Sequence, residues 1–329
     1  MKVLVTTVPF AQEDSSHLDL LDSAGIEYVI NPLGRKLKEA ELAELVPDYD
    51  FLIAGTEPIG PLVMNNAKRL KLISRVGVGL DSVDLCYARE KRISVSYTPE
   101  APAPAVADLS IGLMISLLRG IYQANSDLHD GVWERRQGRR LTEVSVGLVG
   151  LGRIGGRVCK ILNRMGVKRV LVHDSNSELR AVPDLTYEFT DLDDILRTCD
   201  IVSLHVPLTP STKSMISARE ISLMKESSVL VNTARGGIID ETDLADALKA
   251  NQILGAAIDV FEMEPYDGEL RRLQNCLLTA HMGSMSIDCR FRMEYEATQE
   301  VVRFATGEPC ISLVPEEEYN LQALKNDKE

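Results

Sequence analysis

The order strand, glycines, helix is clearest at residues 146–156, which read Val146-Gly-Leu-Val-Gly150-Leu-Gly152-Arg-Ile-Gly155-Gly156. Apolar residues typical of a buried strand lead into closely spaced glycines, and a helical pattern follows. Gly150 permits a tight turn, Gly152 lets the backbone approach a pyrophosphate, and Gly155 lets helix and strand pack closely. The stretch therefore predicts a dinucleotide-binding unit with phosphates at a helix N-terminus.

The strand expected next, residues 169–173, ends at an acidic residue, Asp174, roughly twenty positions after the motif begins. A carboxylate there accepts hydrogen bonds from the ribose hydroxyls of NAD and repels the 2′-phosphate of NADP. Taken alone, the glycines can be a flexible turn and Asp174 a solvated acid. Their combination predicts NAD as the cofactor.

Short β-branched runs alternate with helical patterns on both sides of this stretch. Strands are expected at residues 3–6, 26–30, 51–54, 72–76, 144–149, 169–173, 201–206, 229–233, 255–260 and 277–281. This alternation is typical of α/β folds with doubly wound parallel sheets. Residues 97–104, Tyr-Thr-Pro-Glu-Ala-Pro-Ala-Pro, contain three prolines and predict a hinge.

A chain of 329 residues is about twice a typical domain length. We therefore expect two Rossmann-like domains with an active-site cleft between them. Residues 1–98 plus 285–329 would form a discontinuous substrate domain, and residues 99–284 the NAD-binding domain. One long helix is expected at 105–125, and the polar tail from Glu316 onward is expected to be a solvated surface segment.

Composition disfavours several classes of protein. Lys and Arg total 36 against 49 Asp and Glu, and the formal net charge of −13 repels nucleic acids and anionic membranes. The six cysteines lack close pairs, so neither a metal site nor a disulfide framework is expected. No apolar run has the length of a signal peptide or a membrane span. We expect a cytoplasmic protein with a small-molecule partner and no metal.

Further segments resemble the D-isomer-specific 2-hydroxyacid dehydrogenases, a family that includes phosphoglycerate, hydroxypyruvate/glyoxylate and D-lactate dehydrogenases. Besides the glycine motif, they are Arg75-Val-Gly77-Val-Gly79-Leu-Asp81-Ser-Val-Asp84, His205-Val-Pro-Leu-Thr209, Asn232-Thr-Ala-Arg235-Gly-Gly, Asp259-Val-Phe-Glu-Met-Glu264-Pro265 and Thr279-Ala-His281-Met-Gly283. The resemblance covers nearly the whole chain. It implies reversible hydride transfer between NAD(H) and C2 of a small 2-hydroxy or 2-keto acid, and a homodimer formed through the helix expected at 105–125.

The resemblance also implies a catalytic trio of Arg235, Glu264 and His281. His281 would donate a proton to the substrate oxygen during reduction and remove one during oxidation. Glu264 would hold the other ring nitrogen and favour the charged ring, which fixes the tautomer. Arg235 would offer its planar fork to the substrate carboxylate and polarise the C2 carbonyl.

The remaining contacts are likewise carried over from the family. Those to the cofactor are Gly150, Gly152, Arg153, Ile154, Gly155, Asp174, His205, Pro207, Thr212, Thr233, Ala234, Arg235, Asp259, His281 and Gly283. Those to the substrate are Ala54, Gly55, Val78, Gly79, Arg235 and His281. Asp259 would accept a hydrogen bond from the nicotinamide carboxamide, and the N–H groups of Val78 and Gly79 would bind the substrate carboxylate.

Two features narrow the substrate and the class. Residues 53–58 offer Ala54, Gly55 and Glu57 where phosphoglycerate-type members often have an arginine, which disfavours a phosphorylated substrate, although Arg75 can still supply positive charge. An NAD-sensing regulatory protein of the corepressor type is an alternative to an enzyme. Formate dehydrogenases usually have Gln in place of Glu264, which speaks against that branch.

Overall fold

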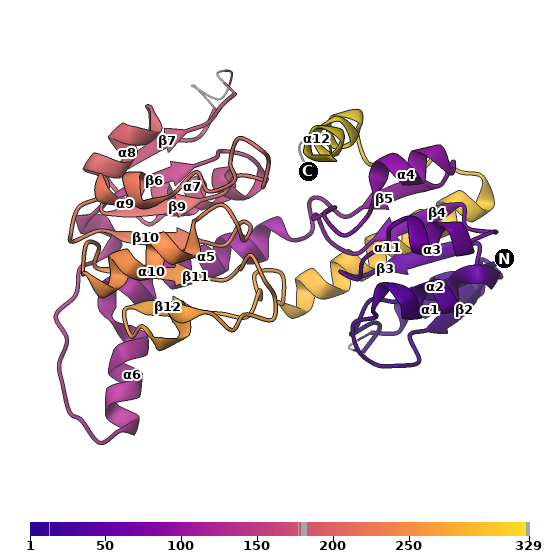
Figure 1. The fold of residues 1–329 in the computed structure, drawn as a ribbon, viewed down its shortest axis with the longest axis horizontal. Helices are drawn as coiled ribbons and strands as arrows, with labels where there is room; N and C mark the ends of the chain where they lie inside the picture. Colours follow the sequence, from indigo (N-terminus) through magenta and orange to yellow (C-terminus); the bar gives the residue numbers. More distant parts are fainter. Residues whose placement is uncertain (13, 177, 179–182, 327–329) are drawn as a thin grey trace. The chain divides into compact units, whose positions relative to one another are not determined.

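The computed structural model describes residues 1–12, 14–176, 178 and 183–326 (Figure 1). The chain forms two compact units, one of Met1–Pro102 together with the chain from Met285 onward, and one of Ala103–Ser284. Each unit has a parallel sheet flanked by helices. The expected α/β class with two Rossmann-like sheets is confirmed.

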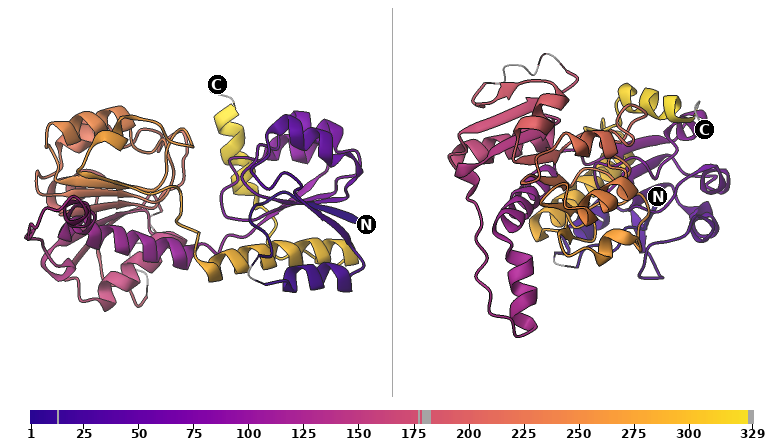
Figure 2. Two further views of the ribbon diagram at one scale, coloured as in Figure 1. Left: turned by 90° about the horizontal axis from the view of Figure 1, so that it is seen from below. Right: turned by 60° about the vertical axis from the view of Figure 1, so that its left-hand side comes forward.

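The first unit is built on a five-stranded parallel sheet with the order β2-β1-β3-β4-β5. Its strands are β1 (Lys2–Val5), β2 (Glu27–Ile30), β3 (Phe51–Ala54), β4 (Leu72–Arg75) and β5 (Ser94–Tyr97). Its helices are α1 (Ser16–Ser23), α2 (Glu39–Leu45), α3 (Pro61–Asn66), α4 (Leu85–Glu90), α11 (Ile287–Thr306) and α12 (Glu316–Asn326), with a 3₁₀ turn at Val46–Asp48. Helices α1 and α11 pack together on one face of the sheet, while α2 and α3 lie on the other (Figure 2).

The second unit has a seven-stranded parallel sheet with the order β12-β11-β10-β9-β6-β7-β8. Its strands are β6 (Ser145–Val149), β7 (Arg169–His173), β8 (Glu188–Phe189), β9 (Ile201–Leu204), β10 (Val229–Asn232), β11 (Gly255–Ile258) and β12 (Cys276–Leu278). Its helices are α5 (Ala103–Arg119), α6 (Ile121–His129), α7 (Arg153–Arg164), α8 (Leu192–Thr198), α9 (Ala218–Ser222) and α10 (Glu241–Lys249), with 3₁₀ turns at Leu141–Glu143 and Glu269–Arg272.

The strand order of the second unit reverses at β6, which lies between β7 and β9. Apolar residues of α5 and α7 fill the core on one face of the sheet, and those of α8, α9 and α10 fill it on the other. In open parallel sheets, ligands bind at the carboxyl ends of the strands where the order reverses. The glycine motif follows β6, so it lies at that place.

The prediction of a single helix at 105–125 is wrong, because this segment forms two helices. Helix α5 ends at Arg119 and α6 begins at Ile121, with a bend of 63° between them. Gly120 adopts φ +57°, a left-handed conformation that costs glycine little. Within the described residues, no single helix is long and apolar enough to cross a membrane. Among them, only α5 and α6 counted together, with the bend between them, have the length and apolar composition of a span.

Residues 120–140, which we call the arm, comprise α6 and the segment that returns from it. Helix α6 has no buried residue, and the arm projects from the sheet of the second unit (Figure 1). The arm exposes large apolar side chains at Ile121, Leu128, Val132 and Trp133, the last with 82% of its surface accessible. Tyr122 on α6 is partly buried and packs against the hydrophobic core of the second unit, whereas these four apolar side chains stay exposed.

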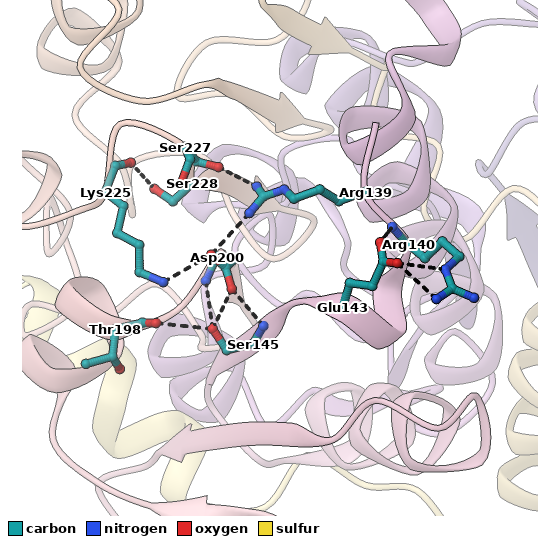
Figure 3. A network of polar contacts seen from close by, with 9 residues as sticks. All are labelled: Arg139, Arg140, Glu143, Ser145, Thr198, Asp200, Lys225, Ser227 and Ser228. Atoms are coloured by element: carbon teal, nitrogen blue, oxygen red, sulfur yellow. Dashed lines mark hydrogen bonds and ion pairs between the residues drawn. The ribbon is translucent and has the colours of Figure 1, made fainter. Parts of the chain in front are cut away.

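Asp200 anchors the end of the arm to the sheet (Figure 3). Its Oδ2 accepts the N–H and the hydroxyl of Ser145 at 2.8 and 2.7 Å, and its Oδ1 accepts from Arg139 and Lys225 at 3.2 and 3.0 Å. Arg139 also donates to the carbonyl of Ser227. The network thus joins the amino ends of β6 and β9 to the residue at which the arm returns.

The tail from Glu316 onward, expected to be a solvated surface segment, is helical: it forms α12, whose described side chains are exposed or partly buried. Val314 is buried, and Tyr319 packs against the same hydrophobic core as Leu85 and Ala88 of α4. The three glutamates at 316–318 open the helix, where negative charge is favourable next to the positive end of the helix dipole. Their acidic character is typical of a helix N-terminus as well as of a solvated tail, and only the packing distinguishes the two.

Candidate active site

The glycine turn connects β6 to α7 and is shaped by close packing. Gly150 has φ +99°, and a Cβ there would lie 2.5 Å from the carbonyl oxygen of His205. A Cβ on Gly155 would lie 2.1 Å from the carbonyl oxygen of Gly150. By contrast, a Cβ on Gly152 would meet nothing within 4 Å. Packing within the chain therefore requires two of the glycines, whereas the third leaves open space at the start of α7.

Asp174 lies next to this turn, directly after β7. Its Oδ2 accepts the N–H of Leu151 at 2.7 Å, and its Oδ1 accepts the N–H of Asn176 at 2.8 Å. The carboxylate is therefore fixed beside the glycine turn, and each oxygen retains a lone pair for another donor.

His205 follows β9 and packs beneath the glycine turn. Its Nε2 lies 3.0 Å from Ser203 Oγ, and its buried Nδ1 has no partner among the residues that the structure describes. Burial lowers the pKa of His205 to about 4, so the ring is neutral near pH 7. Farther along the same loop, the Thr212 hydroxyl donates to the carbonyl of Pro207 at 2.6 Å. The Thr212 hydroxyl thus fixes the conformation of the loop between Pro207 and Thr212.

The turn after β10 is organised by Asn232, which the list of expected contacts did not include. Its Oδ1 accepts the N–H of Ala234 at 3.0 Å, and its Nδ2 donates to the carbonyl of Arg235 at 2.9 Å. The hydroxyl of Thr233 lies 2.8 Å from that of Ser110 on α5. Asn232 is the last residue of β10, and an Asn at the point where a strand turns is a known turn signal, so the sequence could have indicated this role. Arg235 Nη1 donates to the carbonyl of Ala234 at 2.7 Å.

Asp259 follows β11 and is 1% exposed. Its Oδ1 accepts the hydroxyl of Thr279 at 2.6 Å and the N–H of Met282 at 2.9 Å, and its Oδ2 accepts the N–H of Gly283 at 3.0 Å. The carboxylate therefore holds the loop that carries His281. Thr279 was not among the expected site residues, and no local pattern distinguishes it.

His281 and Glu264 form a close pair. His281 Nδ1 lies 2.8 Å from Glu264 Oε2 and 3.0 Å from Oε1. Glu264 Oε1 also accepts the N–H of Phe261 at 3.1 Å. His281 has φ +49°, a left-handed conformation that is uncommon for residues other than glycine, and its N–H donates to the carbonyl of Asp259 at 2.8 Å. The pair leaves Nε2 as the ring nitrogen that faces outward from the carboxylate, and 47% of the His281 side chain is exposed.

In the first unit, two loops follow adjacent strands. Ala54 ends β3, and the N–H of Gly55 donates to Glu57 Oε1 at 3.1 Å. Val78 and Gly79 lie in the loop after β4, and within the described part of the chain no hydrogen bond uses the N–H of either residue. Two adjacent N–H groups at the carboxyl end of a parallel strand are suited to an anion.

Parallel pairing brings the predicted residues of the second unit to one edge of its sheet. The glycine turn, Asp174, His205, Arg235, Asp259 and His281 each follow the carboxyl end of a strand, namely β6, β7, β9, β10, β11 and β12. A dinucleotide-binding sheet whose carboxyl edge also carries a histidine–carboxylate pair defines the class of nicotinamide-dependent dehydrogenases.

Comparison with known proteins specifies the family. Residues 111–283 match the family model described as "D-isomer specific 2-hydroxyacid dehydrogenase, NAD binding domain". The chain is 35% identical to a hydroxypyruvate reductase of Thermotoga maritima, over 87% of this chain and 96% of that protein. It is 32% identical to a D-3-phosphoglycerate dehydrogenase of Synechocystis over 90% of this chain, but it spans only 55% of that protein's length.

A solved structure gives the same result. The TT0316 protein of Thermus thermophilus superimposes with a TM-score of 0.87 at 35% identity, covering 96% of this chain and all of that one. The chain therefore belongs to the D-isomer specific 2-hydroxyacid dehydrogenase family, as its motifs predicted. It is an NAD-dependent oxidoreductase that acts on CH–OH donors.

Proposed function

We propose that this enzyme interconverts a small, unphosphorylated 2-keto acid, hydroxypyruvate or glyoxylate, and the corresponding 2-hydroxy acid. The observation that carries the proposal is the 2.8 Å contact between Glu264 and His281 Nδ1, which leaves Nε2 to exchange a proton with a substrate oxygen. The similar hydroxypyruvate reductase of Thermotoga maritima supports the substrate class.

The residues at the carboxyl edge of the second sheet suit NAD. The open space at Gly152 lies at the N-terminus of α7, where backbone N–H groups and the helix dipole favour a pyrophosphate. Asp174, fixed beside that turn, would accept hydrogen bonds from the adenosine ribose. When bound, the cofactor supplies or accepts the hydride at C2. The buried neutral ring of His205 adds no charge to this site.

We assign distinct roles to the three catalytic side chains. During reduction, the proton on His281 Nε2 passes to the substrate carbonyl oxygen, and Glu264 stabilises the ring charge before transfer. Arg235 binds the substrate carboxylate and polarises the carbonyl, since its guanidinium presents several donors in one plane. Oxidation runs these proton steps in reverse.

The first unit would contribute the N–H groups of Val78 and Gly79 to the substrate carboxylate. Glu57 is 1% exposed, and its carboxylate accepts from the hydroxyl of Thr6 as well as from the N–H of Gly55. Glu57 was expected to face the substrate, but its carboxylate instead binds groups of the chain itself. Residues 53–58 nevertheless contain no Lys or Arg that could pair with a phosphate.

A panel of 2-keto acids tests the proposal. NADH oxidation is followed with glyoxylate, hydroxypyruvate, pyruvate and 3-phosphohydroxypyruvate, and kcat/KM is compared. We expect turnover, with the unphosphorylated acids preferred. A strong preference for 3-phosphohydroxypyruvate would assign the phosphate to Arg75, the last residue of β4, which is buried against Gly77. Absence of turnover with every acid would favour the regulatory alternative.

The exposed apolar residues of the arm support a homodimer. Helix α6 has no buried residue of its own, and the arm carries Trp133 almost fully exposed. Large apolar groups gathered on a projecting element mark an interface, and most oligomers of soluble proteins are symmetric dimers. We propose that a second copy of this chain covers the arm.

A further inference from the structure

The C-terminal helix contacts the turn that follows the proposed carboxylate-binding loop. Gln322 on α12 accepts the N–H of Leu85 through Oε1 at 2.6 Å and donates through Nε2 to the carbonyl of Val83 at 2.8 Å. These two backbone groups flank Asp84, which caps α4 by accepting the N–H of Tyr87. One side-chain amide thereby satisfies a donor and an acceptor at the start of α4.

Apolar and cationic contacts seat α12 on the same region. The guanidinium of Arg89 lies 3.9 Å from the centre of the Tyr319 ring and binds both oxygens of Glu316. Tyr319 packs against the core that contains Leu80, and Val78 packs against the same core. The helix therefore contacts both the backbone of the turn and the core beneath the loop.

The segment before α12 is itself fixed to the sheet. The N–H of Tyr97 on β5 donates to the carbonyl of Ser312 at 3.0 Å, and the N–H of Val314 donates to the carbonyl of Val95 at 2.9 Å. Glu300 on α11, which is 4% exposed, accepts the N–H of Ser312 at 3.2 Å. Because the tail is anchored before the helix begins, α12 can restrain what it touches.

The loop is thus held at both ends. At its start, the N–H of Gly77 donates to Thr98 Oγ1 at 2.8 Å, and the N–H of Thr98 donates to the carbonyl of Gly77 at 3.1 Å. At its end, Gln322 holds Val83 and Leu85. Val78 and Gly79 lie between these two attachments.

We propose that α12 is a clasp that sets the position of the loop between Gly77 and Val83, with Gln322 as its positioning residue. The inference rests on the proposed function, in which Val78 and Gly79 bind the substrate carboxylate. Hydrogen bonds weaken steeply when the donor is misaligned, so loosening the end of the loop weakens carboxylate binding. The carboxylate is bound equally in the ground state and in the transition state, so weaker binding destabilises both by the same amount. We therefore expect KM to rise and kcat to stay unchanged.

The test compares Gln322→Ala with Asn320→Ala, which alters an exposed residue of the same helix. For Gln322→Ala we expect KM for the 2-keto acid to rise about fivefold, the factor that corresponds to one net hydrogen bond. We expect kcat and the Kd of NADH to stay within twofold, roughly the experimental scatter. Amide hydrogen exchange of residues 78–85 should be faster in Gln322→Ala than in Asn320→Ala. Gln322→Met preserves side-chain length and serves if the alanine variant does not fold.

Two results would overturn the clasp: an unchanged KM in an active Gln322 variant, or exchange of residues 78–85 equal to that of the Asn320 control. If the wild-type protein reduces none of the acids, the proposed function fails separately. The clasp is then decided by the exchange measurement alone, because faster exchange confined to residues 78–85 supports it and equal exchange refutes it.

Discussion

Glu264 Oε2 lies 2.8 Å from His281 Nδ1, while Oε1 of the same carboxylate accepts the N–H of Phe261 at 3.1 Å. The backbone therefore holds the carboxylate in place as it faces the ring. Because Nδ1 is occupied by the carboxylate, Nε2 is the nitrogen available for proton transfer. Replacing Glu264 by glutamine removes the charge that faces the His281 ring and nearly preserves the shape of the side chain.

Glu264→Gln should lower kcat/KM in both directions by roughly tenfold or more, because the neutral amide no longer stabilises the charged ring from which reduction takes its proton and which oxidation forms. The values of kcat/KM are recorded in both directions at saturating cofactor. An unchanged kcat/KM in both directions would contradict the proposed role of Glu264.

Arg235→Lys should lower kcat/KM by roughly a hundredfold or more, because lysine keeps the charge but loses the planar fork. The Kd of NADH should change little. Arg219→Lys, at a surface arginine that pairs with Asp193 and Glu220, is the matched control. An active Arg235→Lys enzyme would show that charge alone suffices.

NAD should be strongly preferred over NADP, because Asp174 places a negative charge where the 2′-phosphate would lie. Asp174→Asn removes the charge and retains an oxygen that can accept the N–H of Leu151, as Oδ2 now does at 2.7 Å. The ratio of kcat/KM for NAD to that for NADP should fall about tenfold or more in this variant. An unchanged ratio would mean that another residue discriminates the cofactors.

Asp200 should stabilise the second unit near neutral pH. Burial opposes its ionisation, but hydrogen bonds from Ser145 and Lys225 outweigh this and lower the pKa of Asp200 from 3.8 to about 2. A lowered folded pKa contributes stability above the unfolded value that is lost as pH falls toward 2. Asp200→Asn should cost about 2 kcal/mol of unfolding free energy at pH 7, measured by urea denaturation. The difference in unfolding free energy between wild type and Asp200→Asn should become smaller as the pH falls from 3.8 to about 2. A difference that does not change with pH would disprove the charge effect.

Leu128→Asp should convert the proposed dimer to a monomer in sedimentation velocity experiments, because it buries a charge in the covered arm. Ser126→Asp, two residues earlier and therefore on the opposite side of α6, is the control. Trp133 is the single tryptophan of the chain, so its fluorescence should shift to the red when the arm becomes solvated. A wild-type protein that sediments as a monomer would refute the dimer.

The sequence determined the fold class and most strands because local pattern suffices for them. Strand β3 and strand β7 fall where the apolar runs predicted, and the glycines at 150 and 155 are required by packing within the chain. The order of the family motifs also placed Glu264 and His281 in one site. The two residues are 17 positions apart in the sequence, so local pattern could not predict that they pair. That prediction came from the resemblance to the family.

Only the tertiary structure decided how buried polar groups are used. Glu57 and Asp259 look like site acids in sequence, yet both are almost fully buried and accept hydrogen bonds from the chain's own N–H and hydroxyl groups. Gly120 adopts a left-handed conformation and divides the expected long helix. The sequence did not indicate this break, because a glycine inside a helical pattern does not by itself predict a left-handed turn. The acidic tail becomes α12 because Tyr319 and Gln322 find partners on α4 and the turn before it, contacts between residues more than 200 positions apart that no sequence period encodes.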